Sequence, residues 1–271
     1  MPQSLPFRPG LRRCVLAVAI VVTMLPGGLF HFAFAAASEP QANPASQTLV
    51  FVLPAVVGTL TLPMAGDGRR LPAVVLVHDA LGPDPRSERY IAQLGAAGIA
   101  VLELLSEEVL PVLPLAAAAL AADPRIDGSR IGVLGFGAGA AAAAAVRVPF
   151  AARALLYPGC ATLPADRALP PASARTPVLL LHGAADPANP PAACATAVEA
   201  LARDGAAVRR VEYAGAGFAW DRPAYGQEGR SLLPAPGSTE RVPAVPWPEL
   251  AELSATQVAG FFARALEAAR R

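Results

Sequence analysis

Hydrophobic runs and polar breaks alternate along most of the chain. Short continuous apolar runs, typical of strands buried on both faces of a parallel sheet, lie at 72–78, 99–102, 131–134, 152–156, 177–181 and 207–213. Segments typical of helices lie between and after them, at 86–97, 115–122, 191–203 and 250–270. In the last segment Val258, Phe262 and Leu266 recur with Phe261 at helical spacing, which indicates a core-facing side. The alternation predicts an α/β fold, a doubly wound, mostly parallel sheet with helices on both faces.

Two further segments flank this pattern. Residues 48–53 and 58–62 are short apolar runs separated by a turn, which predicts a β-hairpin at the entry to the domain. Residues 223–248 are rich in Pro and Gly and too long for a simple connector. We expect this segment to be a surface flap or part of a lid, with 207–213 as the last strand.

The N-terminus has the pattern of a secretory signal peptide. Arginines at 8, 12 and 13 precede an apolar run at 14–25 and a small-residue stretch with A-x-A sites at 33–38. We predict a signal peptide over 1–37, cleaved after Ala35 or Ala37, a linker over 38–47 and a domain over 48–271. The protein is then secreted or periplasmic in a bacterium, with no stable membrane span after cleavage.

Two alternatives to a cleaved signal peptide are open. Residues 14–37 are long enough to cross a bilayer as an uncleaved anchor, although Pro26-Gly27-Gly28 interrupts a helix there. Arg12-Arg13 also resembles a twin-arginine signal, but neither Ser nor Thr directly precedes the pair.

Composition narrows the class of protein. With 271 residues and 54% hydrophobic residues, the chain can bury one full α/β core. All 22 basic residues are arginine; without the three in the leader, 19 basic face 21 acidic residues, a net charge near −2. This balance excludes the basic footprint of a nucleic-acid-binding protein. We expect neither a metal nor another cofactor, and the sequence indicates no oligomeric state.

Three cysteines are present. Cys14 is lost with the leader, so the exported chain keeps Cys160 and Cys194 in a compartment that permits disulfides. Counting alone favours a disulfide between them and leaves two buried thiols as the alternative.

The segment 130–139 carries the most informative motif. It reads Arg-Ile-Gly-Val-Leu-Gly-Phe-Gly-Ala-Gly and continues into an alanine tract, a strand–turn–helix pattern typical of a nucleophile elbow, G-x-Nuc-x-G. Gly137 occupies the nucleophile position, so the turn is present and the attacking atom is absent. The spacing Gly135-x-Gly137-x-x-Ala140 also fits a dinucleotide fingerprint, although the next predicted strand ends without the acidic residue that would bind the ribose.

A series of motifs in fixed order extends this observation. The chain carries Val-Leu-Val-His-Asp at 75–79, the elbow, Tyr-Pro-Gly-Cys at 157–160, Leu-His-Gly-Ala-Ala-Asp at 181–186 and Tyr-Ala-Gly-Ala-Gly-Phe-Ala-Trp-Asp-Arg-Pro at 213–223. From about 48 to 262, this order resembles the dienelactone hydrolase family. The resemblance implies an α/β-hydrolase fold and ester or lactone hydrolysis by a nucleophile, a histidine base and an orienting carboxylate. Cys160 and Cys194 occupy the positions of a cysteine pair in exported members, which also implies a disulfide.

The triad that the resemblance implies is incomplete. Asp186 matches the acid, but Gly137 stands at the nucleophile position and Phe218 at the base position. Neither glycine nor phenylalanine has an atom that attacks an acyl carbon or accepts a proton. The sequence therefore predicts a non-catalytic or ligand-binding member whose partner is a small ester- or lactone-like molecule.

Other residues are candidates for a rearranged site. By the same resemblance, Asp79 matches an acidic residue beside the nucleophile, and the amides of Ala80 and Ala138 are the oxyanion donors. His78 and His182, the two histidines outside the leader, both lie where strands are predicted to end. Either could act as the base of an ester or lactone hydrolase, the first alternative; a dinucleotide-binding protein is the second.

Overall fold

A computed structural model describes most of the chain beyond the leader. The described residues are 46–53, 56–64, 68–106, 109–163, 176–203, 205–223 and 231–269, together with 19–21 and 33–35. The chain divides into two units, Met1–Pro44 and Ala45–Arg271. The second unit contains the elbow and the other motifs between 75 and 223, and the leader pattern lies in the first.

The first unit is described only at two short strands. β1 (Ala19–Val21) pairs antiparallel with β2 (Ala33–Ala35), so these six residues are not helical, unlike in the membrane-anchor alternative. The leader arginines, Cys14 and the cleavage position after Ala37 lie outside the described residues. Among the residues that the structure does describe, no helix has the length and apolar character to cross a membrane.

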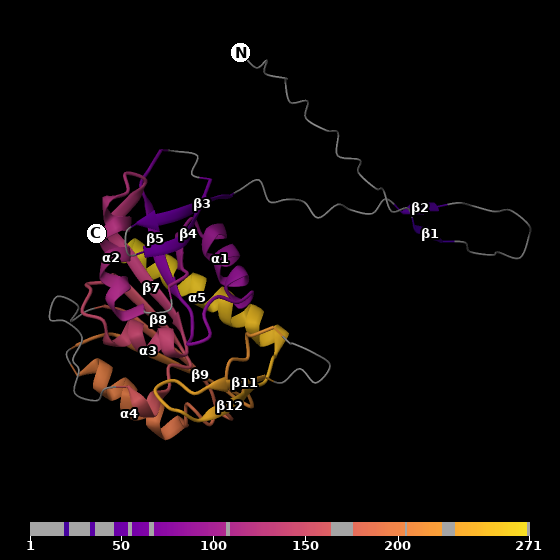
Figure 1. Cartoon of the computed structure of the whole chain (residues 1–271), viewed down its shortest axis with the longest axis vertical. Helices are drawn as coiled ribbons and strands as arrows, with labels where there is room; N and C mark the ends of the chain where they lie inside the picture. Colours follow the sequence, from indigo (N-terminus) through magenta and orange to yellow (C-terminus); the bar gives the residue numbers. More distant parts are fainter. Residues whose placement is uncertain are drawn as a thin grey trace, which may run out of the picture. The chain divides into compact units, whose positions relative to one another are not determined.

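An eight-stranded sheet forms the centre of the second unit (Figure 1). Its strands are β3 (Ser46–Leu53), β4 (Val56–Pro63), β5 (Leu71–Val77), β6 (Ala100–Leu104), β7 (Ile126–Phe136), β8 (Ala152–Leu156), β9 (Val178–Gly183) and β10 (Val208–Tyr213). The order across the sheet is β10-β9-β8-β7-β5-β6-β4-β3, parallel from β10 to β6 and antiparallel at β4 and β3. The predicted fold class is confirmed, and the predicted entry hairpin is β3–β4.

Helices cover both faces of the sheet. They are α1 (Arg86–Ala96), α2 (Val109–Ala122), α3 (Ala138–Ala145), α4 (Pro191–Ala202) and α5 (Pro248–Ala268). Val74 and Leu76 of β5 pack with α1 and α5 in one hydrophobic cluster, and Val75 and Val77 pack with α2, α3 and α4 in the other. Alternate residues of a strand point to opposite faces, so a strand covered on both sides must be apolar throughout, which explains the continuous apolar runs.

A buried arginine fixes the end of α3. Arg153 of β8 is fully buried and donates hydrogen bonds to the carbonyls of Ala143, Val146 and Val148. These bonds serve carbonyl groups at the C-terminus of α3, where the last turn has no helical donors. Burial lowers the pKa of Arg153 to about 10. The helix that follows the predicted elbow is therefore held from its far end.

Several predicted boundaries differ from the structure. β3 begins at Ser46, inside the predicted linker, α2 begins six residues before 115, and β7 begins five residues before 131. The prediction that 207–213 is the last strand is wrong, because β11 (Ser231–Pro234) and β12 (Arg241–Ala244) form an antiparallel hairpin inside the predicted flap. Leu233 and Val242 of this hairpin are buried, so burial of an apolar side stabilises it despite its prolines.

Candidate active site

The predicted elbow joins β7 to α3. Gly137 lies between Phe136 and Ala138 with φ 51° and ψ −117°, a conformation that L side chains rarely adopt. A Cβ on Gly139 would lie 2.2 Å from the carbonyl oxygen of His78, and a Cβ on Gly135 would lie 2.5 Å from the amide nitrogen of Ala140. The flanking glycines are therefore needed because strand and helix approach closely.

The space above Gly137 is occupied by side chains. A Cβ on Gly137 would lie 3.1 Å from Cβ of Asp79, 3.7 Å from Cγ of Pro236 and 3.8 Å from Cζ of Phe218. Gly137, Phe218 and Pro236 are all buried. The structure thus places Gly137, Phe218 and Asp79, three of the predicted site residues, near one another. Pro236 comes from the segment predicted to be a flap, and no sequence motif indicated it.

The acid position, Asp186, has local partners. Its carboxylate accepts hydrogen bonds from the amide of Ala188 and from Nδ2 of Asn189, both at 2.8 Å. Oδ1 of Asn189 in turn accepts from the amides of Gly159 and Cys160, at 2.8 and 3.1 Å. Burial raises the pKa of Asp186 to about 6, although these hydrogen bonds oppose the shift. Asp186 thus orients Asn189, which fixes the loop that carries Cys160.

That loop is also fixed covalently. Cys160 and Cys194 form a disulfide with an S–S distance of 2.05 Å and a Cα–Cα distance of 4.9 Å, across a sequence separation of 34. The predicted disulfide is confirmed, and the alternative of two free thiols is wrong. The bond joins the 3-10 turn Cys160–Thr162 to α4.

His78 belongs to a buried polar pair. Its Nε2 lies 2.9 Å from Oε1 of Glu103, whose Oε2 accepts a hydrogen bond from Thr59 at 3.1 Å. Nδ1 of His78 is buried and has no hydrogen-bond partner among the described residues. Burial raises the pKa of Glu103, but hydrogen bonds from His78, Ser87 and Thr59 outweigh burial and leave it below the usual value. Because the Glu103 carboxylate accepts a hydrogen bond from Nε2–H, the free lone pair of the imidazole is on Nδ1. This is the arrangement of a general base.

His182 is engaged at both ring nitrogens. Nε2 accepts a hydrogen bond from Nε of Arg210 at 2.8 Å, which leaves the proton on Nδ1, 3.2 Å from the carbonyl oxygen of Gly183. Burial lowers the pKa of His182, and the positive charge of Arg210 lowers it further. A neutral imidazole with both nitrogens bonded is suited to holding β9 against β10.

The carboxylate of Asp79 lies in an ion cluster. Its Oδ2 accepts from Nη2 of the fully buried Arg86 at 2.5 Å and lies 3.7 Å from Nη1 of Arg222. Arg86 also donates from Nε to both oxygens of the Asp84 carboxylate and from Nη2 to Oδ2. The negative charge of Asp79 is thereby compensated by two arginines, neither of which was among the predicted site residues.

Arg86 connects this cluster to a deeper network. Its Nη1 donates to the hydroxyl of Tyr157 at 3.1 Å, and that hydroxyl donates to Oδ1 of Asp221 at 2.7 Å. Tyr90 donates to Oδ2 of Asp221 at 2.6 Å. Burial raises the pKa of Tyr157, of Tyr90 and of Asp221, so both phenols stay protonated and act as donors. The network supports the turn after β8, where Tyr157 has a positive φ of 41°.

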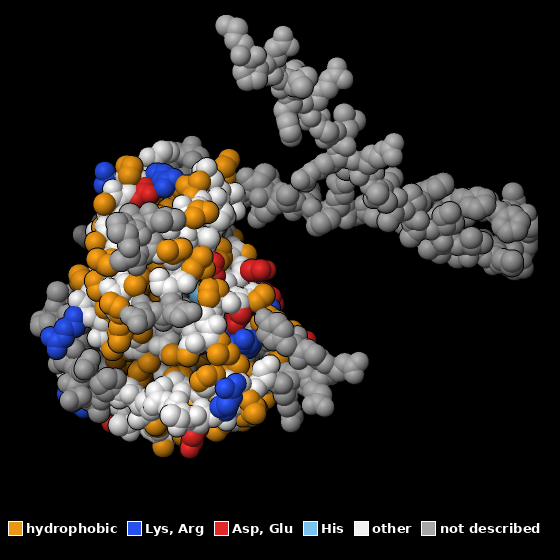
Figure 2. Space-filling model, in the orientation of Figure 1, with side chains coloured by type: hydrophobic (Ala, Val, Ile, Leu, Met, Phe, Trp, Pro, Cys, Tyr) orange, Lys and Arg blue, Asp and Glu red, His pale blue; other side chains and the backbone are white. Residues whose placement is uncertain are grey.

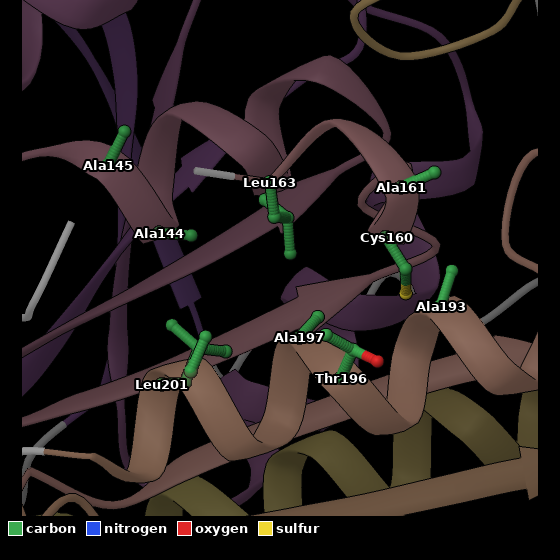
Figure 3. A pocket seen from close by; sticks show the side chains of 10 residues that line it. Ala144, Ala145, Cys160, Ala161, Leu163, Ala193, Thr196, Ala197 and Leu201 are labelled. Carbon is green, nitrogen blue, oxygen red and sulfur yellow. The ribbon is translucent and has the colours of Figure 1, made fainter. Parts of the chain in front are cut away.

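A cavity of about 320 Å³ is lined by the C-terminal end of α3, the segment 160–163 and α4. Figure 3 shows Leu163, Leu201 and the sulfur of Cys160 directed into it. Its lining residues are Ala144, Ala145, Cys160, Ala161, Leu163, Ala193, Thr196, Ala197, Ala200 and Leu201. None of the triad positions contributes to it.

The two predicted oxyanion donors are more accessible than Gly137. Ala80 is exposed and Ala138 is half-buried, so these two residues are the accessible part of the elbow region.

On the visible face, charged side chains are scattered around the margin and hydrophobic ones extend across the middle (Figure 2). Within the described part of the chain, no three His, Cys, Asp or Glu side chains are grouped as a metal would require.

Comparison with known proteins identifies a family by sequence and similar structures by fold. A family model for the dienelactone hydrolase family matches residues 87–231. A sequence search of curated proteins finds no significant match. A dienelactone hydrolase-like promiscuous phosphotriesterase from metagenomic libraries is similar in structure, with a TM-score of 0.61, 20% identity and coverage of 81% of this chain and 98% of that chain.

Two other solved structures agree with this fold. A dienelactone hydrolase-annotated protein of Klebsiella pneumoniae gives a TM-score of 0.57 at 19% identity, covering 81% of this chain and 99% of its own. Carboxyl esterase 2 of the fungus Tuber melanosporum gives a TM-score of 0.59 at 15% identity, with coverage of 83% of this chain and 89% of that chain. At these identities the structural similarity establishes the α/β-hydrolase fold. Together with the family model, it favours the elbow over the dinucleotide interpretation of 135–140.

Proposed function

This chain belongs to the dienelactone hydrolase family, and we propose that it is a member without triad hydrolysis that binds a small ester- or lactone-like molecule. The observation that carries this proposal is the proximity of Phe218 to Gly137: its ring lies 3.8 Å from where a Cβ on Gly137 would stand. The family resemblance assigns the nucleophile and base roles to these two positions, and neither residue has a reactive atom. Losing a triad nucleophile removes nearly all of the triad's contribution to the rate of hydrolysis.

The surroundings of the elbow support the same proposal. Phe218 and Pro236 lie in van der Waals range of where a side chain on residue 137 would begin, so the space next to that position is apolar. Asp186, which would orient a histidine, instead holds Ala188 and Asn189. The retained acid therefore has a structural reason to be present that is independent of catalysis.

Binding would use the accessible residues next to the elbow, Ala80, Leu81 and Ala138. The amides of Ala80 and Ala138 are the donors that the family resemblance assigns to a carbonyl oxygen, and Leu81 beside them is 49% exposed. Two amides and an apolar side chain suit a neutral molecule with one carbonyl group.

One solution experiment tests binding and non-hydrolysis together. Saturation-transfer NMR with a dienelactone as the probe should give a transfer signal, while the intensity of the lactone resonances stays constant over hours. Leu81→Glu should weaken the signal, and Leu115→Glu, at a 47% exposed leucine of α2, should not. Product resonances that grow with protein concentration, or no transfer signal at all, would refute the proposal.

A second candidate function rests on His78. Its Nε2 is bonded to Glu103 and its Nδ1 has no partner among the described residues, as in a base that activates water. Water would add to the carbonyl carbon and give a proton to Nδ1. The C–O bond would then break as the leaving alkoxide takes that proton, giving an acid and an alcohol. If this is the activity, ester turnover is lost in His78→Gln, reduced in Glu103→Gln and retained in His182→Gln.

Export is part of the proposal. The leader pattern over 1–37 and the disulfide between Cys160 and Cys194 both suit a secreted or periplasmic protein, because structural disulfides are rare in the cytosol. N-terminal sequencing of exported protein should begin at Ala36 or Ser38. A sequence that begins at Met1 would contradict cleavage and favour an anchored form.

A further inference from the structure

The two edges of the central sheet differ in charge. β10, at one edge, carries Arg209, Arg210 and Glu212 within its six residues. Charged side chains on an edge strand oppose pairing with another chain. β3, at the other edge, reads Ser-Gln-Thr-Leu-Val-Phe-Val-Leu, eight residues without a charge, a proline or a glycine (Figure 1). Only the β3 edge lacks the features that discourage strand addition.

β3 also has apolar side chains on both of its faces, as strands inside a sheet often do. Val50 is 79% exposed, the largest exposed fraction among the large hydrophobic residues described as exposed. Leu49 and Phe51 point to the other face and pack against the core. On its inner side β3 pairs with β4, and no described strand pairs with its outer side. Its outward N–H and C=O groups therefore form a ready template for a further strand.

We propose that β3 pairs antiparallel with β3 of a second copy of this chain, which joins the two sheets into one. Antiparallel pairing about a twofold axis perpendicular to the sheet keeps each face continuous and sets each residue opposite its mirror position. A register centred on Val50 places Val50 opposite Val50 of the second copy and Leu49 opposite Phe51 of the second copy. Such apolar and aromatic cross-strand pairs are stabilising.

Absence of charge is what favours a second copy over an unrelated partner. At a twofold axis a charged residue near the centre faces its own copy, and like charges directly opposite are destabilising. β3 avoids this conflict along its whole length, whereas β10 would meet it in a register centred on Arg209 or Arg210, where that arginine would face its own copy. Eight-residue strands alone give an interface near or below the ~1,200 Å² of stable complexes, so we expect a dimer that dissociates in the micromolar range.

Mass measurement tests the dimer. Light scattering of the full chain across about 1 to 200 µM should show the mass rising from one copy to two. Val50→Lys should remain monomeric. The control variant, Val57→Lys, should still dimerise. Val57 is a 46% exposed valine of β4 that pairs with β3 on one side, and its carbonyl accepts a hydrogen bond from the amide of Leu105 on the other. A wild type that stays monomeric, or a Val50→Lys protein that dimerises equally, overturns the proposal.

Cross-linking tests the register and does not depend on a charge being tolerated. Directly opposite residues in an antiparallel pair have Cα atoms about 4.5 to 5.5 Å apart, within disulfide range. In full chain carrying Cys14→Ser, Val50→Cys should give a covalent dimer on mild oxidation, and Val57→Cys should not. A Val50→Cys thiol that stays unlinked in monomeric protein would mean that another segment covers the edge, and the proposal would be wrong.

Discussion

The ring of Phe218 lies 3.8 Å from the point at which a side chain on Gly137 would begin. By the family resemblance, these two residues correspond to the nucleophile and base positions, 81 residues apart in sequence. Under the proposed function, their proximity means that the frame of the site is kept while its reactive atoms are missing.

Restoring both atoms should restore chemistry. In Gly137→Cys/Phe218→His, a thiol and an imidazole would stand at adjacent positions, and we expect aryl-ester hydrolysis about 10²-fold above either single variant. A side chain at φ 51° should cost about 1–3 kcal/mol of stability. Turnover of p-nitrophenyl acetate and thermal unfolding measure the two effects. A folded double variant no more active than the singles would show that the donors of Ala80 and Ala138 no longer fit a carbonyl oxygen.

The close approach of α3 to β5 predicts a contrast between two glycines. Gly139→Ala would place a methyl group 2.2 Å from the carbonyl oxygen of His78, so we expect a loss of about 3 kcal/mol or more. Gly95→Ala in α1 meets nothing within 4 Å and should stabilise by about 0.5–1 kcal/mol. Urea denaturation of both variants gives the comparison. Equal effects would mean that helix and strand are not as close as described.

The disulfide should account for a measurable share of stability. Cys160→Ala/Cys194→Ala opens a loop with a sequence separation of 34, for which chain entropy gives about 3–4 kcal/mol. Chemical denaturation of oxidised wild type and the double variant measures the difference, and thiol titration of unreduced, unfolded protein provides the control. Two titratable thiols outside the leader, or no loss of stability, would contradict the assignment.

Asp186 should make stability depend on pH in a defined direction. Its pKa in the folded protein is about 6 against 3.8 in the unfolded chain, so the folded state binds the proton more tightly between these values. Its contribution to the free energy of unfolding therefore falls as pH rises from 4 to 6, by up to about 3 kcal/mol. Asn at this position does not titrate, so the stability of Asp186→Asn relative to wild type should increase over that interval. A difference independent of pH would mean that the Asp186 carboxylate is not buried.

The sequence predicted which segments form the central sheet more accurately than it predicted where individual helices and strands begin and end. β8 was predicted with both of its ends, because a run buried on both faces is apolar throughout and ends where burial ends. α2 was predicted too short because Pro111 and Pro114 resemble a break. Pro111 lies in the first turn, where a helix has no partner for the missing N–H, and Pro114 is accommodated inside the helix.

The candidate site was predicted by motif where motifs exist. Gly137, Phe218 and Asp79 could be assigned because each lies within a motif of the family resemblance, and the disulfide could be predicted from the count of cysteines and from the same resemblance. Pro236 and Arg86 could not, because their roles depend on how distant segments pack. Glu103 did carry a signal, since a single acidic residue within an apolar strand needs a buried partner, and that partner is His78.

Turnover by the unaltered chain tests the central claim most directly. Purified full chain, at concentrations up to about 100 µM, should hydrolyse a dienelactone no faster than the same buffer without protein. The account is contradicted by saturable turnover that is proportional to the protein through two further purification steps and is lost in His78→Gln.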